Sequence, residues 1–447
     1  MTDKLKIQPK AGRIILFILA SSLLFLGFYR NQWQMARPKK FSSFQKDVES
    51  YVIARMVLTR QSGIFSQGGL PGWGDVDPEN INESDHEHQY DAYFEGLAFG
   101  SYWVKKSHPG FQGIFFSLLD RSSPFAPRMN LRLFRMFASG SFAATLAGLV
   151  LWFYTEFGKL SALLVFVSML LSQWMTLFGR NLFFVSAFFY LPMLVLLFRL
   201  QKEKHGHPLS DKQLFWMVFA LILLKCLLNG YDFILPTLGM AASPIVFYGL
   251  SEGWDRTLLV KRFLIVAMTA LLAILVSLMI LSVQVMYASG NLNDGLNSIL
   301  TTINRRVFSQ DPDQMAIYEE SSRASYWSIL KIYLSESYLD RWPVPYFIII
   351  IGFAVCSVMA IYSIKNRRFP NPTLAVASIA TTWFALLSPL SWFIIFKSLA
   401  YFHTHMNYLP WHMPFTLFGF GMCGYLLEST LTQINKSTPV RPISPAQ

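Results

Sequence analysis

Residues 14–65 read IILFILASSLLFLGFYRNQWQMARPKKFSSFQKDVESYVIARMVLTRQSGIF, an apolar run followed at once by a mixed polar and apolar segment. The run over residues 14–28 has the composition of a membrane span, which needs about 20 mostly apolar residues. Basic residues precede it, as in a signal peptide: Lys4, Lys6, Lys10 and Arg13. No small-residue cleavage site follows, because Arg30 and the stretch QWQ at residues 32–34 come next. We therefore predict a retained signal anchor that places residues 41–65 just outside a membrane.

Long apolar runs recur along most of the 447 residues, of which 53% are hydrophobic and 14% are charged. A soluble domain carries roughly 25% charged residues. In lipid, every backbone polar group has to be paired within its own segment, which favours helices. The sequence therefore predicts an all-α polytopic membrane protein. The predicted spans are ten in number and cover about residues 14–29, 133–154, 159–178, 182–199, 213–229, 232–250, 262–286, 344–364, 373–396 and 409–427.

Charge in the connecting segments predicts the orientation. The short basic loops all fall on one side if the N-terminus is cytoplasmic, as the positive-inside rule expects. Residues 1–13 and the tail 429–447, which is rich in Pro, Ser and Thr and reads as disordered, are then cytoplasmic, and residues 14–428 form one membrane domain. Two long segments, 30–132 and 287–342, face outward. The predicted location is a bacterial inner membrane, with the functional residues on the periplasmic or exterior face.

A net charge of +12 would by itself suggest nucleic-acid binding. Because the basic residues cluster in short loops beside apolar runs, membrane topology explains this charge, and no nucleic-acid partner is predicted. The three cysteines, Cys226, Cys356 and Cys423, lie inside apolar runs, so neither a disulfide framework nor a cysteine metal site is predicted.

Residues 41–65 carry apolar side chains at helical spacing, which predicts an amphipathic helix in the plane of the membrane surface. Asp47 and Glu49 stand near its start. Residues two apart on a helix point to nearly opposite sides, so both carboxylates could meet one ligand only if the helix begins at about Asp47. The alternative is structural: Asp47 caps the helix, and Glu49 favours the positive end of the helix dipole.

A larger pattern surrounds these two acids. Its residues are Asp47, Glu49, Tyr51, Ala54, Arg55, Leu58 and Gly63. With this spacing the segment resembles the first outer loop of the GT-C glycosyltransferases, closest to the aminoarabinose transferase and protein O-mannosyltransferase type. Residues 106–111, KSHPGF, are similar to the Lys/His-Pro-Pro-Leu stretch of those families, with Gly110 in place of the second proline. Residues 133–136, LFRM, open the next span as in the family.

The resemblance covers roughly the first 200 residues and the overall layout. It implies a GT-C-like fold whose long first outer loop carries juxtamembrane amphipathic helices. It also implies a glycosyltransferase that moves a sugar from a polyprenyl-phosphate donor to a lipid, glycan or protein acceptor on the outer face, in polysaccharide or glycoconjugate synthesis for the cell envelope. In such enzymes an acid of this loop is the general base, often with a divalent ion such as Mg²⁺, Mn²⁺ or Ca²⁺ nearby.

The chemistry of that transfer suggests roles for individual residues. An acceptor hydroxyl is a weak nucleophile, and a positioned carboxylate accelerates its attack about 10²–10⁴-fold. We predict that Asp47 is the base and Glu49 a metal ligand or positioner, although the reverse assignment is open and both acids are candidate metal ligands. The departing lipid phosphate needs cations, and the candidates are Arg180, Lys225, Arg305, Arg306, Lys397, His403 and His405. The candidate acceptor contacts are His108, Asp91 and Tyr408.

A second acidic stretch lies at residues 75–91, where a D-x-D-x-E-N opening resembles a calcium-binding loop. Its twelfth position is His86 where that loop has a bidentate Glu, and Pro78 falls inside it. A bound cation and a solvated loop over the site are both open readings. For the H-T-H pair His403 and His405, metal ligation, contact with phosphate or sugar, and a structural role are all open.

Two other functions fit parts of this pattern. A ligase or polymerase of the O-antigen type would move a whole glycan from a polyprenyl diphosphate, and would depend on outer His and Arg residues more than on Asp47. A transporter of lipid or polysaccharide would have polar residues near the bilayer midplane, broken helices and repeated halves. The spans hold one clear internal charge, Lys225, and no evident repeat, so sugar transfer is the predicted function.

Overall fold

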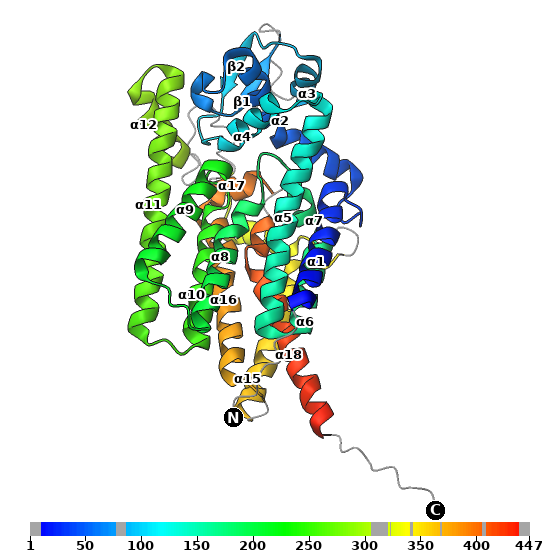
Figure 1. Cartoon of the computed structure of the whole chain (residues 1–447). Coiled ribbons are helices and arrows are strands. Elements are labelled where there is room, and N and C mark those ends of the chain that lie inside the picture. The colour runs from blue at the N-terminus through cyan, green and yellow to red at the C-terminus, as the bar shows by residue number, and fades with distance from the viewer. Residues whose placement is uncertain are drawn as a thin grey trace, which may run out of the picture.

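The computed structural model describes residues 10–76, 86–304, 321, 323–339, 343–366, 369–404 and 408–437. Figure 1 shows a bundle of long helices with a smaller outer layer above one end, while the end of α18 projects from the other. The outer layer comprises α2 (Pro38–Ser62), η1 (Ser66–Gly69), β1 (Gly72–Asp75), α3 (His86–Glu95), β2 (Ser101–Val104) and α4 (Phe111–Ser122). All of these elements belong to the first long outer segment of the sequence.

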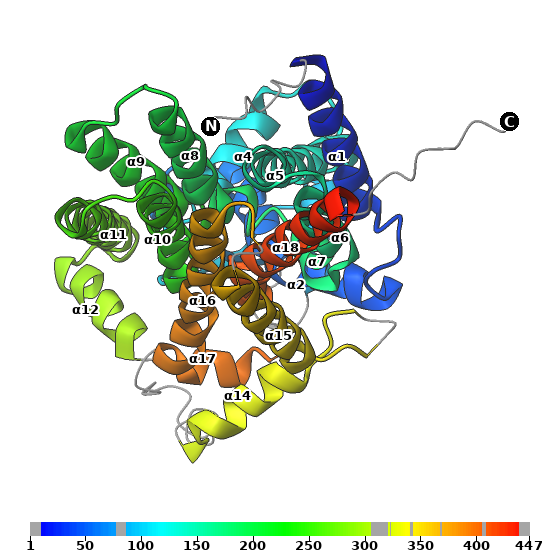
Figure 2. The same cartoon turned by 90° about the horizontal axis from the view of Figure 1, so that it is seen from below.

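The other elements form the bundle and its connections. They are α1 (Lys10–Arg30), α5 (Pro127–Phe157), α6 (Lys159–Leu171), α7 (Gln173–Phe178), α8 (Ala187–Lys204), α9 (Asp211–Asn229), α10 (Ile234–Ser251), α11 (Arg256–Ser289), α12 (Leu292–Ile303), α14 (Tyr326–Ser335), α15 (Tyr346–Lys365), α16 (Pro372–Ile395), α17 (Lys397–Phe402), η3 (Leu409–His412) and α18 (Phe415–Ser437). Figure 2 shows α18 between α6 and α16, with α10 beside α16.

By length and composition, six helices in the described part of the chain are able to cross a membrane. They are Ala11–Arg30, Pro127–Phe157, Ile234–Ser251, Arg256–Ser289, Tyr346–Lys365 and Pro372–Ile395. The chain is therefore a mainly helical membrane protein. Each of the ten predicted spans contains a helix, but only these six meet the criteria of a span, so the count of ten stays a prediction.

Several predicted spans have wrong boundaries: α5, α11 and α18 each begin six residues from the predicted start, at Pro127, Arg256 and Phe415. Two further differences have a local cause. Residues 159–178 form two helices, because Ser172 ends α6 and caps α7 by accepting a hydrogen bond from the Met175 backbone N–H (3.2 Å). The helix of the span predicted to start at residue 182 begins five residues later, at Ala187, because Asn181 holds a turn before α8. Its Oδ1 accepts hydrogen bonds from the backbone N–H groups of Phe183 (2.9 Å) and Phe184 (3.4 Å).

Helix α2 confirms the predicted helix over residues 41–62. Its polar side, however, does not face water along its whole length. Below, Phe44 packs against Phe178 of the bundle, with ring centroids 4.9 Å apart. Above, the outer layer covers it, so that Glu49 and Arg55 are fully buried. Arg55 donates hydrogen bonds to the backbone oxygens of residues 63, 64 and 66, just beyond the end of α2. This side chain thus satisfies backbone carbonyls of the turn that follows the helix.

The outer layer also contains a two-stranded antiparallel sheet, which the all-α prediction missed. Strands β1 and β2 lie on either side of α3 in the sequence and pair with Trp73 opposite Trp103. One face of this sheet needs glycine, because a Cβ on Gly74 would lie 2.1 Å from the ring of Phe99. A strand of sequence Gly-Trp-Gly-Asp has none of the alternating β-branched residues that usually predict strands, so tertiary packing decided its conformation.

Asp120 at the end of α4 ties the outer layer to the bundle. Its carboxylate is buried and accepts two hydrogen bonds from Arg60 of α2, at 2.8 and 3.0 Å. It also accepts from the hydroxyl of Tyr93 on α3 (2.6 Å) and the amide of Asn130 on α5 (2.9 Å). One charge therefore joins four helices, which fixes the outer layer over the bundle.

Candidate functional site

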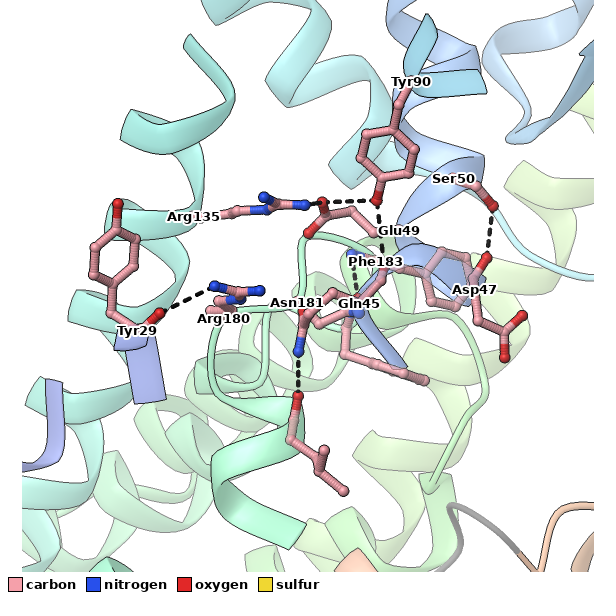
Figure 3. Close-up of polar contacts among 12 residues, drawn as sticks. Tyr29, Gln45, Asp47, Glu49, Ser50, Tyr90, Arg135, Arg180, Asn181 and Phe183 are labelled. Atoms are coloured by element: carbon pink, nitrogen blue, oxygen red, sulfur yellow. Dashed lines mark hydrogen bonds and ion pairs between the residues drawn. The ribbon is translucent and has the colours of Figure 1, made fainter. Parts of the chain in front are cut away.

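The two acids of the sequence motif lie on different sides of α2, as Figure 3 shows. Helix α2 begins at Pro38, well before either acid, with proline in its favoured first position. Asp47 is therefore neither at the cap nor before it, and Glu49 is not at the positive end of the helix. Both earlier readings, a shared ligand and a structural cap, are wrong for the same reason: the helix starts about three turns too early.

Glu49 faces α5 and is enclosed. Its Oε1 accepts hydrogen bonds from Arg135 Nε (2.9 Å) and Nη2, and from the hydroxyl of Tyr90 (3.0 Å). Burial, and then the charge of Glu49, raise the pKa of Tyr90 well above that of a free phenol, so this hydroxyl stays protonated and donates. With its side chain completely buried, Glu49 has no open path to an acceptor, which favours the predicted role of positioner over that of base.

Asp47 is on the accessible side, with 46% of its side chain exposed. Its Oδ1 lies 3.3 Å from Nε2 of His86, the first residue of α3. The other ring nitrogen of His86 lies 3.4 Å from Oγ of Ser50, which itself accepts a hydrogen bond from the indole N–H of Trp73 (3.1 Å). This chain of contacts orients the Asp47 carboxylate while leaving it open to a substrate, as a general base requires.

A cation lies on the same face of α2. Tyr51 is one turn beyond Asp47, and its ring stacks on Trp73 with a centroid distance of 4.6 Å and an interplanar angle of 11°. On Tyr51 lies the ammonium of Lys105, 4.0 Å from the ring centroid and 5.4 Å from that of Phe183. Lys105 directly precedes the KSHPGF stretch, yet it was not among the predicted site residues. His86 and Trp73 were not among them either.

Arg180, a predicted phosphate contact, is not brought to Asp47. Figure 3 shows it beside Arg135, on the Glu49 side of α2. Its Nη1 donates to the backbone oxygen of Tyr29 (3.2 Å), and its guanidinium lies 4.3 Å from the ring centroid of Phe41. Burial, followed by the like charge of Arg135, lowers the pKa of Arg180 to about 10.

The remaining predicted cations have structural contacts. Lys225 is fully buried, and its ammonium donates to the backbone oxygens of Gly230 (2.8 Å) and Asp232 (2.6 Å), just after α9. Lys397 donates to the backbone oxygen of Ala324 (2.9 Å). His403 follows α17, where its backbone N–H caps the helix. Arg305, Arg306 and His405 lie outside the described residues.

The predicted acceptor contacts are scattered. Asp91 is exposed on α3. Tyr408 is buried in the bundle, stacked on Trp174 with ring centroids 4.7 Å apart. His108 is also buried: its Nδ1 accepts a hydrogen bond from the Gly110 N–H (3.1 Å), and its ring lies 4.7 Å from that of Phe183. The structure thus places Tyr408 and His108 out of an acceptor's reach.

Gly230 allows His108 to pack closely, which gives a testable expectation for stability. Its φ is +58°, and a Cβ there would lie 2.3 Å from Cδ2 of His108. We expect Gly230→Ala to lower the free energy of unfolding by about 1–3 kcal/mol more than Gly96→Ala, because overpacking adds to backbone strain. Gly96 is the matched control, since its φ is +72° and its Cβ would meet nothing within 4 Å. Equal losses, measured by denaturant unfolding in detergent, would show that the contact is unimportant.

The described residues do not fit a divalent cation. Glu49 is saturated on one oxygen by Arg135 and Tyr90 and points away from Asp47. Across the described ranges, no group of three or more His, Cys, Asp or Glu side chains is arranged to hold a metal ion. The part of the 75–91 stretch from 77 to 85 is outside the description. A metal ion therefore stays a prediction from the resemblance, and no step below uses one.

Comparison with known proteins finds no matching family model, no matching curated protein and no matching solved structure. The function of the protein is consequently inferred from the site itself. That site consists of Asp47 with His86, and of Tyr51 with Lys105, on one face of α2 at the outer end of the bundle.

Proposed function

We propose that the protein is a membrane glycosyltransferase of GT-C type, which transfers a sugar from a polyprenyl phosphate to an acceptor on the extracytoplasmic face. One observation supports it most: the carboxylate of Asp47 is accessible, held by His86, and shares a helix face with the ammonium of Lys105. The orientation rests on the positive-inside pattern of the loops. The resemblance of the first outer loop to that superfamily supplies the reaction class.

In the proposed reaction, the acceptor hydroxyl gives its proton to Asp47 while its oxygen attacks the anomeric carbon of the donor sugar. The bond from that carbon to the phosphate oxygen breaks, and its electron pair leaves with the polyprenyl phosphate. Lys105 then offsets the negative charge that develops on the phosphate, an effect that is strong where water is scarce. Glu49 takes no part in the transfer itself in this proposal, because its side chain is fully buried and Arg135 and Tyr90 hold its Oε1.

Mass spectrometry of the lipids that copurify with the detergent-solubilised protein tests this proposal directly. A bound polyprenyl phosphate, or its monosaccharide ester, supports the transferase and identifies the sugar for a transfer assay. A polyprenyl diphosphate that carries an oligosaccharide would instead indicate the ligase or polymerase. If only bulk phospholipid is found, transfer is assayed with synthetic polyprenyl-phosphate sugars, and no turnover with any of them would overturn the proposal.

Lys105→Gln should weaken donor binding by roughly 10- to 100-fold, because a charge-assisted contact to phosphate contributes about 1.5–3 kcal/mol. The donor KM reports this loss, and kcat falls further to the extent that the contact strengthens as the phosphate departs. Lys106→Gln is the control, since it removes the next charge along the chain and leaves the contact between Lys105 and Tyr51 in place. Equal donor KM values for both variants and the wild type would remove Lys105 from the phosphate site.

A further inference from the structure

One face of the two-stranded sheet presents two tryptophans side by side. Trp73 and Trp103 are directly opposite each other in the antiparallel pair, so both side chains leave the same face. Their ring centroids are 5.8 Å apart with an interplanar angle of 30°. The indole of Trp103 is 58% exposed, although a side chain of this size usually buries most of its surface. We refer to Trp73 and Trp103 together as the tryptophan platform.

The tryptophan platform continues into the site described above. Trp73 stacks on Tyr51 of α2 and lies 5.4 Å, centroid to centroid, from the ring of His86. Its indole N–H is bonded to Ser50, so its orientation is fixed. Aromatic rings therefore form an unbroken path from the exposed Trp103 to His86, the residue that holds the Asp47 carboxylate.

Two pairs of polar side chains flank the platform. His86 lies 3.3 Å from Asp47, and His88 lies 3.9 Å from Asp75, measured from ring nitrogen to carboxylate oxygen. Asp75 is two residues beyond Trp73 on β1, and it therefore projects from the same face of the two-stranded sheet. All four polar side chains are partly exposed. The surface thus combines flat apolar rings with carboxylates and imidazoles at their edge.

We propose that the tryptophan platform binds a pyranose ring, and that the acceptor of the transferase is accordingly a saccharide. This inference rests on the proposed function for the link to Asp47. The faces of a pyranose carry C–H groups of slight positive charge, which are attracted to the negative face of an indole. The ring's equatorial hydroxyls point outward, where carboxylates accept hydrogen bonds from them and imidazoles donate or accept.

The position of the two-stranded sheet favours a sugar over a lipid chain. Exposed tryptophans of membrane proteins usually lie at the membrane boundary, where they form an aromatic belt. In Figure 1 the sheet instead lies in the outer layer, beyond the ends of α8 and α10 and level with the outer ends of α11 and α12. A saccharide lying on Trp103 would extend along the aromatic path toward Asp47, which places one of its hydroxyls within reach of the base.

Saturation-transfer difference NMR on the full chain in nanodiscs tests the platform without any donor. The probes are the methyl pyranosides of glucose, galactose, mannose and N-acetylglucosamine, with empty nanodiscs as the blank. At least one probe should receive saturation on the C–H groups of one ring face. Trp103→Ala should weaken binding of that probe about 3- to 10-fold, the effect of losing one aromatic contact, while Trp103→Phe retains part of it. Trp327→Ala is the control, because this residue is 69% exposed on α14.

The outcomes separate this inference from the proposed function. The platform is overturned if no probe receives saturation above the blank, or if Trp103→Ala binds as the wild type does. Asp47→Asn should still give a Trp103-dependent NMR signal, because the asparagine amide also hydrogen-bonds a hydroxyl and stacking on the indole needs no base. A Trp103-dependent signal combined with full transfer by Asp47→Asn would leave the platform standing and remove the proposed base. Transfer that depends on Asp47 but goes to an acceptor that is not a saccharide would support the proposed base and overturn the platform.

Discussion

Asp47→Asn should reduce the rate of sugar transfer by about 10²–10⁴-fold while the protein stays folded. The substitution keeps the shape of the side chain and removes only its ability to take a proton. Because 46% of this side chain is exposed and its contact with His86 is at the surface, we expect little change in stability, within about 0.5 kcal/mol. Donor KM should change less than kcat, since the base acts mainly in the transition state.

Glu87→Gln provides the matched control for Asp47→Asn. Glu87 is an exposed acid of the same outer layer, on α3, where it forms an ion pair with Lys46. Neutralising it removes the same charge from the same region without touching His86 or Asp47. A transfer rate for Asp47→Asn within about threefold of the Glu87→Gln rate would contradict the role of Asp47, since a general base contributes far more than that.

Glu49→Gln should lower the free energy of unfolding by about 3 kcal/mol, the largest stability effect that we expect from a single acid in this motif. The substitution leaves the guanidinium of Arg135 without a counter-charge at a largely buried position. We place the loss at the lower end of the usual range because 20% of the Arg135 side chain reaches solvent. Unfolding in mixed micelles, followed by tryptophan fluorescence, measures it.

The double variant Glu49→Gln/Arg135→Met distinguishes this ion pair from a catalytic role. Removing both charges takes away the unpaired guanidinium, so the double variant should regain part of the lost stability and transfer sugar at a rate near that of the wild type. A stability equal to that of Glu49→Gln alone would show that Arg135 is not the reason for the loss. A stable double variant that is inactive would make Glu49 part of the transfer machinery.

Several features were predictable from the sequence for definite physical reasons. The apolar runs identify helices because lipid leaves no other way to pair the backbone, and every predicted span does contain one. The helical spacing of residues 41–65 predicted a helix here, and α2 covers residues 41–62 of that segment. The choice of Asp47 over Glu49 as base stays a prediction. It now has a geometric argument, since burial of Glu49 depends on Arg135, 86 residues away, which no local pattern reveals.

Other features depend on contacts that sequence patterns do not encode. The start of α2 was misjudged because the polar stretch before Phe44 hid a proline-initiated first turn at Pro38. Arg180 and Lys105 are both basic residues at the outer ends of apolar segments. Only packing decides that Arg180 lies beside Arg135, on the Glu49 side of α2, and that Lys105 lies over Tyr51, on the Asp47 side. The KSHPGF stretch at residues 106–111 identified the right loop. Lys105, which directly precedes it, could have been named as a candidate cation on that ground.

The buried hub at Asp120 and the carbonyl contacts of Arg55 have a consequence for genetic screens. The hydrogen bonds of Arg55 and Asp120 go to residues other than Asp47, yet each side chain holds the outer layer in place through several of them at once. In a complementation screen scored by growth, their replacement and that of Asp47 would give the same phenotype. A position in this loop that tolerates no substitution can therefore be structural as well as catalytic. Only protein abundance, measured alongside growth, can separate the two.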